Sequence, residues 1–180
     1  MFLNDDTIHK LPLISPYNQD QLQPASYDVR LGRNIQIPRP YILDLRSLRP
    51  SKEFMDPYEM GEDESYILRP GDCILGETVE TINVPAYLRA SIEGKSSLAR
   101  LWLFPIAEAG YLDPGFSGVV TLEILNLGPF TLMIYPGMLI AQVSFAELNA
   151  PAKRPYGSEG LGSHYQNQKG VEGSKYGKLG

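Results

Sequence analysis

Short apolar stretches, separated by turns that contain Gly and Pro, run through most of the chain. Pro-Gly pairs at Pro70-Gly71, Pro114-Gly115 and Pro136-Gly137 each lie beside such a stretch, as is typical of turns between strands. Many of the stretches are rich in Val, Ile, Thr or Tyr, which favour strands. The pattern predicts strands at Tyr41–Leu45, Tyr66–Leu68, Cys73–Val79, Leu88–Glu93, Val119–Asn126, Thr131–Tyr135 and Met138–Phe145.

Helical periodicity is sparse. Asn4 or Asp5 is a suitable N-cap for a short helix that continues to about Lys10, and Ser96–Leu103 is a second candidate helix. Many short strands with few helices predict a mainly β protein, a barrel or a jelly-roll-like pair of sheets, rather than alternating β and α units. The 180 residues suit one compact domain.

One predicted strand carries an acid in a largely apolar segment. In Val119–Asn126, the two-residue period of a strand places Glu123 on the same face as Thr121, with Leu122 and Ile124 on the opposite face. An unpaired buried carboxylate is costly. Glu123 is therefore paired, exposed or functional, and periodicity alone does not choose among these.

Composition narrows the class of protein. A net charge of -5 and a pI of about 5.1 argue against a broad basic surface for nucleic acid. No apolar run approaches the roughly 20 residues that span a membrane, and the first ten residues do not resemble a signal peptide. The one cysteine, Cys73, fits a reducing cytoplasm. Together with His9 and His164 it is too little for a Cys/His zinc site.

Two central segments carry most of the candidate chemistry. In GKSSLAR (Gly94–Arg100), two cations flank two hydroxyls, a set that can bind phosphate, although a capped helix start is an equal alternative. In AEAGYLDPGFSG (Ala107–Gly118), Asp113 precedes a Pro-Gly turn, where a side chain often hydrogen-bonds its own turn.

The last 25 residues differ from the rest of the chain. Tyr156–Gly180 contains seven glycines and few aliphatic side chains, so one interpretation is a flexible terminus. Aromatic, amide and cationic side chains are also present, and such an arm can close over a polar ligand. We therefore divide the chain into a β domain, residues 1–155, and a flexible tail, residues 156–180.

Six segments occur in an order that matches a known family. They are SYDVRLG (Ser26–Gly32), GKSSLAR, AGYLDPGFSG, TLEI (Thr121–Ile124), PGMLIAQ (Pro136–Gln142) and the PYGS…HYQNQKG tail. Together they resemble the dCTP deaminase branch of the dUTPase superfamily over nearly the whole chain. The resemblance implies a distorted β-barrel of dUTPase type, a homotrimer with active sites between subunits, and a dCTP or dUTP substrate that carries Mg²⁺ on its phosphates. It implies no catalytic zinc.

The resemblance also assigns roles to residues. Glu123 matches the general base that activates water for attack on C4 of cytosine. Ser96 and the backbone carbonyl of Ala109 match the groups that hold this water, and Arg100 matches the arginine beside the reacting amine. Asp113 matches the acid that contacts the deoxyribose. The other positions matched to substrate binding are Lys95, Ser97, Leu98, Ala99, Thr121, Leu122, Gln142, Tyr156, His164 and Gln168.

The family contains two activities. Some members convert dCTP to dUTP and ammonia, and others continue to dUMP and pyrophosphate. Gly110 and Tyr111 before the acid, together with Gln142, resemble the dUMP-forming type, because deaminase-only members usually carry bulkier basic residues at the first two positions.

The chain also departs from the family pattern. Lys95 stands in place of an arginine and lacks its bidentate fork. Ile106 and Glu108 stand in place of a histidine and a threonine, and His164 in place of a lysine. The resemblance places these changes at phosphate-binding positions or in loops. They keep two other hypotheses open: a dUTP pyrophosphatase without deaminase activity, and a non-catalytic nucleotide-binding regulator.

Overall fold

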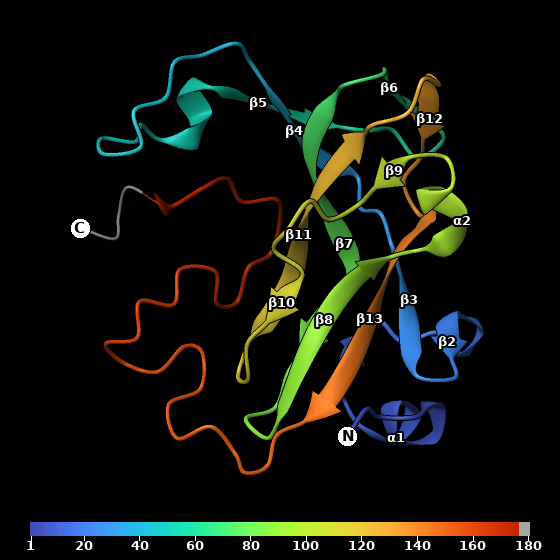
Figure 1. The fold of residues 1–180 in the computed structure, drawn as a ribbon, viewed down its shortest axis with the longest axis vertical. Coiled ribbons are helices and arrows are strands. Elements are labelled where there is room, and N and C mark those ends of the chain that lie inside the picture. The colour runs from blue at the N-terminus through green and yellow to red at the C-terminus, as the bar shows by residue number, and fades with distance from the viewer. Residues whose placement is uncertain (177–180) are drawn as a thin grey trace.

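The computed structural model describes residues 1–176, and most of its regular structure is antiparallel strands (Figure 1). The helices are α1 (Asp5–Lys10) and α2 (Ser96–Ala99), with the 3₁₀ turns η1 (Gln19–Gln21) and η2 (Ser51–Glu53). The strands are β1 (Ile14–Ser15), β2 (Leu22–Gln23), β3 (Ser26–Arg30), β4 (Asn34–Pro38), β5 (Met55–Glu59), β6 (Tyr66–Leu68), β7 (Cys73–Asn83), β8 (Leu88–Gly94), β9 (Leu103–Phe104), β10 (Tyr111–Leu112), β11 (Ser117–Asn126), β12 (Leu132–Ile134) and β13 (Leu139–Glu147).

The strands form two main sheets. The larger sheet runs in the order β5-β4-β7-β11-β9, with β1 also paired to β7, and the second runs β10-β8-β13-β3-β2. A separate two-stranded sheet joins β12 to β6. Mainly β structure was predicted and is confirmed. Within residues 1–176, however, the strands make these separate sheets and do not close into a barrel.

Buried side chains of both sheets make one apolar core. On β11 every second residue is buried, as the two-residue period of a strand requires, and Leu122 and Ile124 point into the core. Val143 and Phe145 contribute from β13. This arrangement leaves the opposite face of β11, which carries Glu123, free to form a site.

A buried ion pair connects the two sheets. Glu80 on β7 is fully buried, and its carboxylate accepts hydrogen bonds from Arg30 Nε (2.7 Å) and the Arg30 backbone N–H (2.8 Å) on β3. Gln21 Nε2 donates to the same carboxylate at 3.0 Å. Because each oxygen has a donor, this acid is paired and structural.

Most predicted elements are confirmed, and two are not. Asn4 caps α1 by accepting a hydrogen bond from the Thr7 backbone N–H. The predicted helix Ser96–Leu103 is only the four residues of α2, because the chain turns away before Trp102, which has a positive φ of 60°. The predicted strand Tyr41–Leu45 is wrong: it lies in irregular chain, its Ile42 is 95% exposed, and prolines before it restrict backbone pairing.

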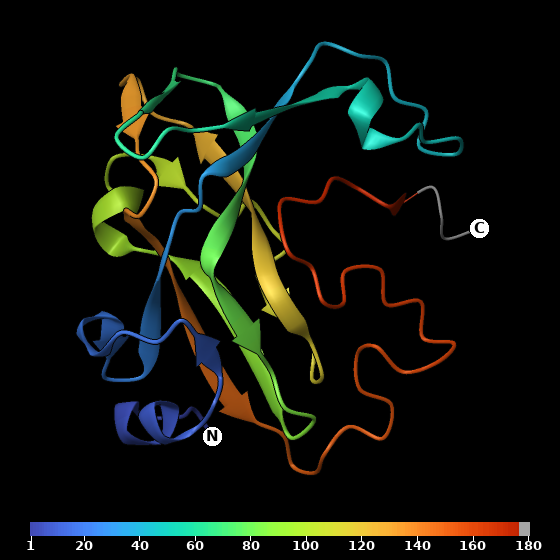
Figure 2. The same cartoon turned by 180° about the vertical axis from the view of Figure 1, so that it is seen from behind.

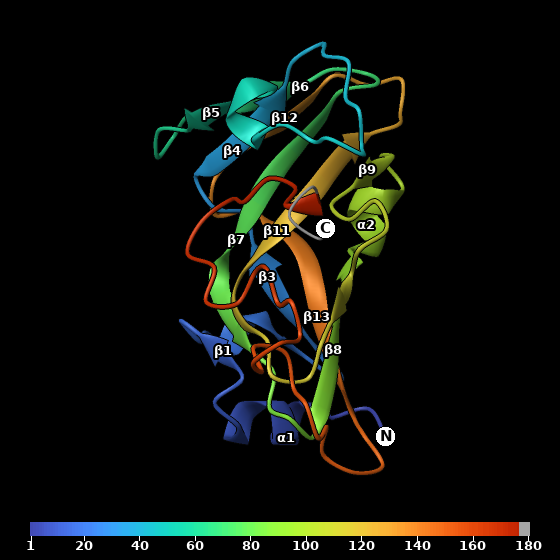
Figure 3. The same ribbon diagram turned by 90° about the vertical axis from the view of Figure 1, so that its left-hand side faces the viewer.

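Two irregular segments lie on the same side of the molecule. Residues 39–54, here called the arm, connect β4 to β5 and project beyond the sheets (Figure 1). Residues 156–176, here called the tail, come after β13; they lie to the right of the strands in Figure 2 and pass in front of β7 and β11 in Figure 3. The division of the chain at residue 155 stays a prediction, and residues 177–180 of the predicted tail lie outside the described residues. No helix in residues 1–176 is both long and apolar enough to cross a membrane.

Candidate active site

A cavity of about 450 Å³ lies between the tail and the exposed face of β11. The β10 strand and the turn that follows it form one wall, β11 forms the floor, and the tail forms the other wall. The lining residues that were predicted for the site are Ala109, Asp113, Thr121, Glu123, Tyr156, His164 and Gln168. Motifs that are far apart in the sequence thus meet at one place.

Glu123 contributes the carboxylate at the floor of this cavity. The alternation of β11 directs its side chain away from the core, as predicted, and Leu75 of β7 lies opposite it in the sheet. Glu123 Oε2 is buried and has no hydrogen-bond partner within residues 1–176. Burying a carboxylate oxygen without a donor costs free energy. The arrangement therefore suits an acid that acquires its partner when a ligand or water enters.

The Pro-Gly turn before β11 shapes the wall next to Glu123. Gly115 has a φ of +96°, and a Cβ there would lie 2.8 Å from the Tyr156 carbonyl oxygen, so only glycine lets the tail approach so closely. The Phe116 N–H donates to the Asp113 carbonyl at 3.0 Å. No hydrogen bond to the Asp113 carboxylate occurs within residues 1–176, so this exposed acid does not serve its own turn and remains available to a ligand.

Tyr111 stands at the edge of the cavity. Its ring is half-exposed, and the Arg89 guanidinium of β8 lies over the ring at 4.8 Å from the centroid. Ala109, two residues earlier, also lines the cavity. Gly110 between them has no room for a side chain, since a Cβ would lie 2.4 Å from the Ile92 carbonyl oxygen.

The tail is hydrogen-bonded along β11. Gln166 accepts from the Ser117 N–H at 3.1 Å, and Gln168 pairs with Gly118 in an isolated parallel bridge. Gln168 Nε2 then donates to the Thr121 hydroxyl at 2.6 Å. The Glu172 N–H donates to the same hydroxyl at 3.2 Å. Thr121 is therefore occupied in holding the tail.

Aromatic side chains support the outer part of the tail. The Tyr156 ring packs on Phe116 with a centroid separation of 5.9 Å, and its hydroxyl accepts from the Tyr165 N–H at 2.9 Å. His164 lines the cavity, and its Nε2 is buried without a hydrogen-bond partner within the described chain. The cavity thus contains two unpartnered polar groups, on Glu123 and His164.

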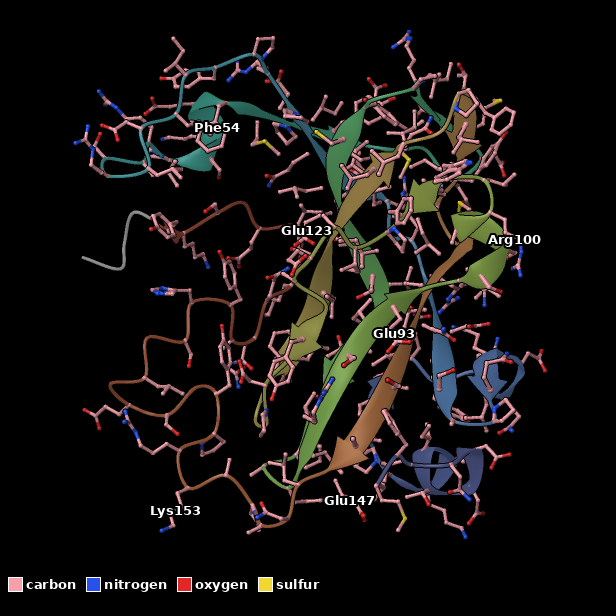
Figure 4. All side chains as sticks on the ribbon, viewed as in Figure 1. Phe54, Glu93, Arg100, Glu123, Glu147 and Lys153 are labelled. Atoms are coloured by element: carbon pink, nitrogen blue, oxygen red, sulfur yellow. The ribbon has the colours of Figure 1, made fainter. Side chains whose placement is uncertain are left out.

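The GKSSLAR segment lies elsewhere in the chain. Lys95, Ser96, Ser97 and Gln142 line a second cavity of about 440 Å³, which shares no lining residue with the first. Arg100 is exposed at the end of α2 and donates to the Ser96 carbonyl at 3.0 Å. Figure 4 places Arg100 and Glu123 on different sides of the molecule. One chain therefore does not bring the predicted base, Glu123, together with Ser96 and Arg100.

At three predicted binding positions, a ligand has little access to the side chain. Leu122 is fully buried in the core, so only its backbone can face a ligand. Leu98 packs against the core from α2, and Ala99 beside it has only a methyl group. These three positions were predicted because they lie within the matched motifs. Their side chains themselves give no reason to expect contact with a ligand.

Glu77 was not predicted, although it lies beneath the tail. It pairs with Thr121 across β7 and β11, and Asn34 Nδ2 donates to its Oε1 at 2.7 Å. Its other oxygen, Oε2, is buried without a hydrogen-bond partner in residues 1–176. Burial raises the pKa of the Glu77 carboxyl, and the Asn34 hydrogen bonds only partly oppose this. The sequence did contain a signal for Glu77, because it is an acid within the largely apolar segment CILGETVETI (Cys73–Ile82).

Metal-binding residues do not cluster in the described chain. Within residues 1–176, no three His, Cys, Asp or Glu side chains gather in a group that could hold a metal ion. Cys73 is exposed and is not paired in a disulfide.

A family model described as dCTP deaminase-like matches residues 2–148, which include both cavities' strand residues. The chain belongs to the dCTP deaminase-like family. A protein of Beutenbergia cavernae named "dCTP deaminase, dUMP-forming" is 42% identical over 165 residues, covering 90% of this chain and 85% of the relative. A protein of Natronomonas pharaonis named "dCTP deaminase" is 45% identical over 158 residues, covering 86% and 80%.

A solved structure gives the same assignment for the fold. The 2'-deoxycytidine 5'-triphosphate deaminase of Agrobacterium tumefaciens superposes with a TM-score of 0.65 at 25% identity, over 82% of this chain. The match covers 48% of that protein, so this chain spans about half its length. The predicted relationship to the dCTP deaminase family is confirmed.

Proposed function

We propose that this protein removes the amino group of dCTP by hydrolysis and then converts the resulting dUTP to dUMP. In the first step one water adds to C4 of cytosine and ammonia leaves, giving dUTP. In the second step another water cleaves the triphosphate, giving dUMP and pyrophosphate. The observation that carries the proposal is the unpartnered Glu123 carboxylate in a cavity walled by the AGYLDPGFSG turn. The name "dCTP deaminase, dUMP-forming", which several relatives carry, supports the second step.

Glu123 acts as the general base. Water is a weak nucleophile, so a positioned carboxylate that accepts its proton lowers the barrier to attack on C4. The proton then passes to ring N3 or to the departing ammonia. The Ala109 carbonyl and the Ser96 hydroxyl hold the water, Arg100 orders the carboxylate and the amine, and Asp113 contacts the deoxyribose. Of these, Ala109 and Asp113 line the Glu123 cavity in the same chain.

The complete site forms between copies of the chain. Ser96 and Arg100 are needed beside Glu123, yet within one chain they line or adjoin a different cavity. A second copy that presents its GKSSLAR segment to the Glu123 cavity supplies them. When each subunit makes this contact with the next, the subunits close into a ring with cyclic symmetry. We propose a homotrimer with three equivalent sites.

Magnesium enters as part of the substrate. The triphosphate of dCTP carries Mg²⁺, which neutralises phosphate charge. Zinc has no role in this mechanism. Treatment with a zinc-selective chelator, followed by re-addition of Mg²⁺, should therefore leave ammonia release unchanged. Stoichiometric zinc whose removal stops the reaction would contradict this. With one cysteine in the chain, a reducing cytoplasm is a suitable compartment.

One experiment separates the proposal from its two alternatives. The protein is incubated with dCTP, dCMP or dUTP in the presence of Mg²⁺, and ammonia and pyrophosphate are followed separately. We expect both products from dCTP. Pyrophosphate from dUTP without ammonia from dCTP would identify a dUTP pyrophosphatase. Binding of dCTP with neither product would identify a non-catalytic regulator.

A further inference from the structure

Lys95 is held by a buried acid that no predicted role includes. Lys95 Nζ lies 2.5 Å from Asp28 Oδ2, and only 5% of the Asp28 side chain is exposed, against 22% for Lys95. Gln23 Nε2 donates to the same oxygen at 3.3 Å. Asp28 also lines the second cavity, together with Ser96 and Ser97. The carboxylate is therefore more deeply buried than the ammonium that it holds, and its other oxygen, Oδ1, is buried without a hydrogen-bond partner within residues 1–176.

The position of Asp28 is fixed by the sheet. Asp28 lies in the middle of β3 and pairs with Gln142 on β13, while Lys95 immediately follows β8 on the other side of β13. The Asp28 carbonyl accepts a hydrogen bond from the buried Gln21 amide at 2.7 Å. Three neighbouring strands thus determine where the carboxylate lies, and the carboxylate in turn determines where the lysine ammonium lies.

A lysine at this place needs such an anchor. Its ammonium is a point charge on a flexible stem, whereas an arginine presents a planar fork that is already shaped for phosphate. Ordering a free lysine side chain on a ligand costs conformational entropy. A carboxylate that holds the ammonium before the ligand arrives removes much of that cost from binding. Asp28 and Lys95 are the two charged residues among those that line the cavity.

We propose that Asp28 is a positioning residue that orients Lys95 toward the substrate phosphates. It does not touch the substrate and takes no part in the chemistry at C4. The inference rests on the proposed function, because it assigns this cavity to the phosphates. It concerns binding in the ground state, so it predicts a change in KM and in affinity rather than in kcat.

The test is a double-mutant cycle between Asp28 and Lys95. The variants are Asp28→Asn, Lys95→Met and the two combined, and the readout is the Kd of α,β-imido-dUTP with Mg²⁺, measured by calorimetry. Loss of a hydrogen bond to a charged group corresponds to about tenfold in affinity. We expect Asp28→Asn to weaken binding about tenfold in the parent protein and to have no further effect in the Lys95→Met background. In the dCTP assay, KM should rise similarly with kcat retained.

Asp20→Asn is the matched control, because Asp20 is an exposed acid of η1 that does not contact Lys95. If Asp28→Asn does not fold, Asp28→Ala, which removes the buried charge and both carboxylate oxygens, carries the same expectation. An unchanged Kd in the folded variant, or an equal loss in the Lys95→Met background, would overturn the inference. Because α,β-imido-dUTP is not turned over, absence of ammonia release from the parent protein would count against the proposed function alone.

Discussion

Three strand acids, Glu80, Glu77 and Glu123, illustrate what burial does to a carboxylate. Glu80 has a donor for each oxygen and joins the two sheets. Glu77 has donors for one oxygen only, and Glu123 lies in the cavity with its Oε2 unpartnered within residues 1–176. Leaving a buried acceptor unsatisfied is costly, so the fold must gain elsewhere. Under the proposed function, the unpartnered oxygen of Glu123 is where the attacking water binds.

The first prediction concerns Glu123 itself. The Glu123→Gln variant keeps the shape of the side chain but cannot accept the water proton. General-base catalysis typically contributes about 100- to 10,000-fold, so we expect ammonia release from dCTP to fall by that factor. Affinity for dCTP should remain within a few-fold. The control is Glu147→Gln, an exposed acid at the end of β13, far from Glu123 (Figure 4). Turnover close to normal in Glu123→Gln would remove Glu123 from the catalytic role.

The second prediction concerns pH and Glu77. Burial raises the pKa of Glu77 above its ordinary value of 4.5, so the folded state holds its proton more tightly than the unfolded state does. Its contribution to stability is complete below pH 4.5 and is lost as pH rises through the folded-state pKa. We expect Glu77→Gln to flatten this decline in the free energy of unfolding, measured by denaturant titration at several pH values.

The matched control for Glu77 is Glu62→Gln, because Glu62 is exposed. That variant should retain the pH dependence of the parent protein. A decline of the same steepness in Glu77→Gln would show that another group is responsible.

The local sequence marked Glu123 and Asp113 as candidates, whereas the roles expected for them came from the resemblance to the family. Glu123 interrupts an apolar strand, and Asp113 precedes a Pro-Gly turn. Glu77 also interrupts an apolar strand, but its contact with Asn34, like that of Asp28 with Lys95, depends on which strands are neighbours in the sheet. One sequence shows alternation along a strand but not which strand lies beside it.

At the scale of elements, the tail behaves as an added layer on β11. Its contacts are hydrogen bonds to the strand edge and to Thr121, together with aromatic packing on Phe116. Few of its side chains enter the core. The composition of the tail therefore indicated that it is not part of the core, but could not show where it lies.

The third prediction concerns this layer. Thr121→Val removes the hydroxyl that accepts from Gln168 and Glu172, so the tail should be held less tightly. We expect kcat/KM for dCTP to fall about tenfold, in line with the loss of one or two hydrogen bonds. Proteolysis within the tail should be faster than in the parent protein, and bound nucleotide analogue should slow it. Thr131→Val, on an exposed turn before β12, is the matched control.

Deletion of residues 157–180 tests the same layer more severely. Activity should be lost while the thermal unfolding transition of the β domain persists, because few core residues are removed. Full activity would show that the tail has no part in turnover. Coincident loss of folding would show that it is structural.

The arm shows where prediction of the elements failed. Tyr41–Leu45 has the composition of a strand, but residues 39–54 remain outside both sheets and several of its large apolar side chains are exposed. Strand propensity measures fit to a half-buried surface, and within residues 1–176 this segment finds none. The short strands β3, β4 and β5 were missed, since each has only five residues and they contain Pro or charged residues that weaken the signal.

At the scale of the whole molecule, the residues that were expected at one site line two separate cavities. Glu123, Asp113 and residues of the tail line the first cavity, whereas Lys95, Ser96 and Ser97 line the second. The first cavity combines β11 of the larger sheet with β10 of the second, whereas the second cavity is lined by β3, β8 and β13, all of the second sheet. The rigid core keeps the two cavities apart within one chain. Under the proposed function, the chemistry therefore requires assembly of at least two chains.

The last prediction tests this requirement by mixing subunits. Glu123→Gln and Arg100→Ala should each be inactive alone, since each removes one half of every site. In a mixed trimer, a site that takes Glu123 from an Arg100→Ala subunit and Arg100 from a Glu123→Gln subunit is complete. Random mixing of equal amounts should therefore restore about a quarter of the parent activity, because two independent choices of subunit must both be favourable. The variants are unfolded and refolded together, ammonia release is compared with that of each variant refolded alone, and oligomer size is measured by light scattering. Activity in the mixture no greater than in the separate variants, with trimers present, would show that each chain completes its own site.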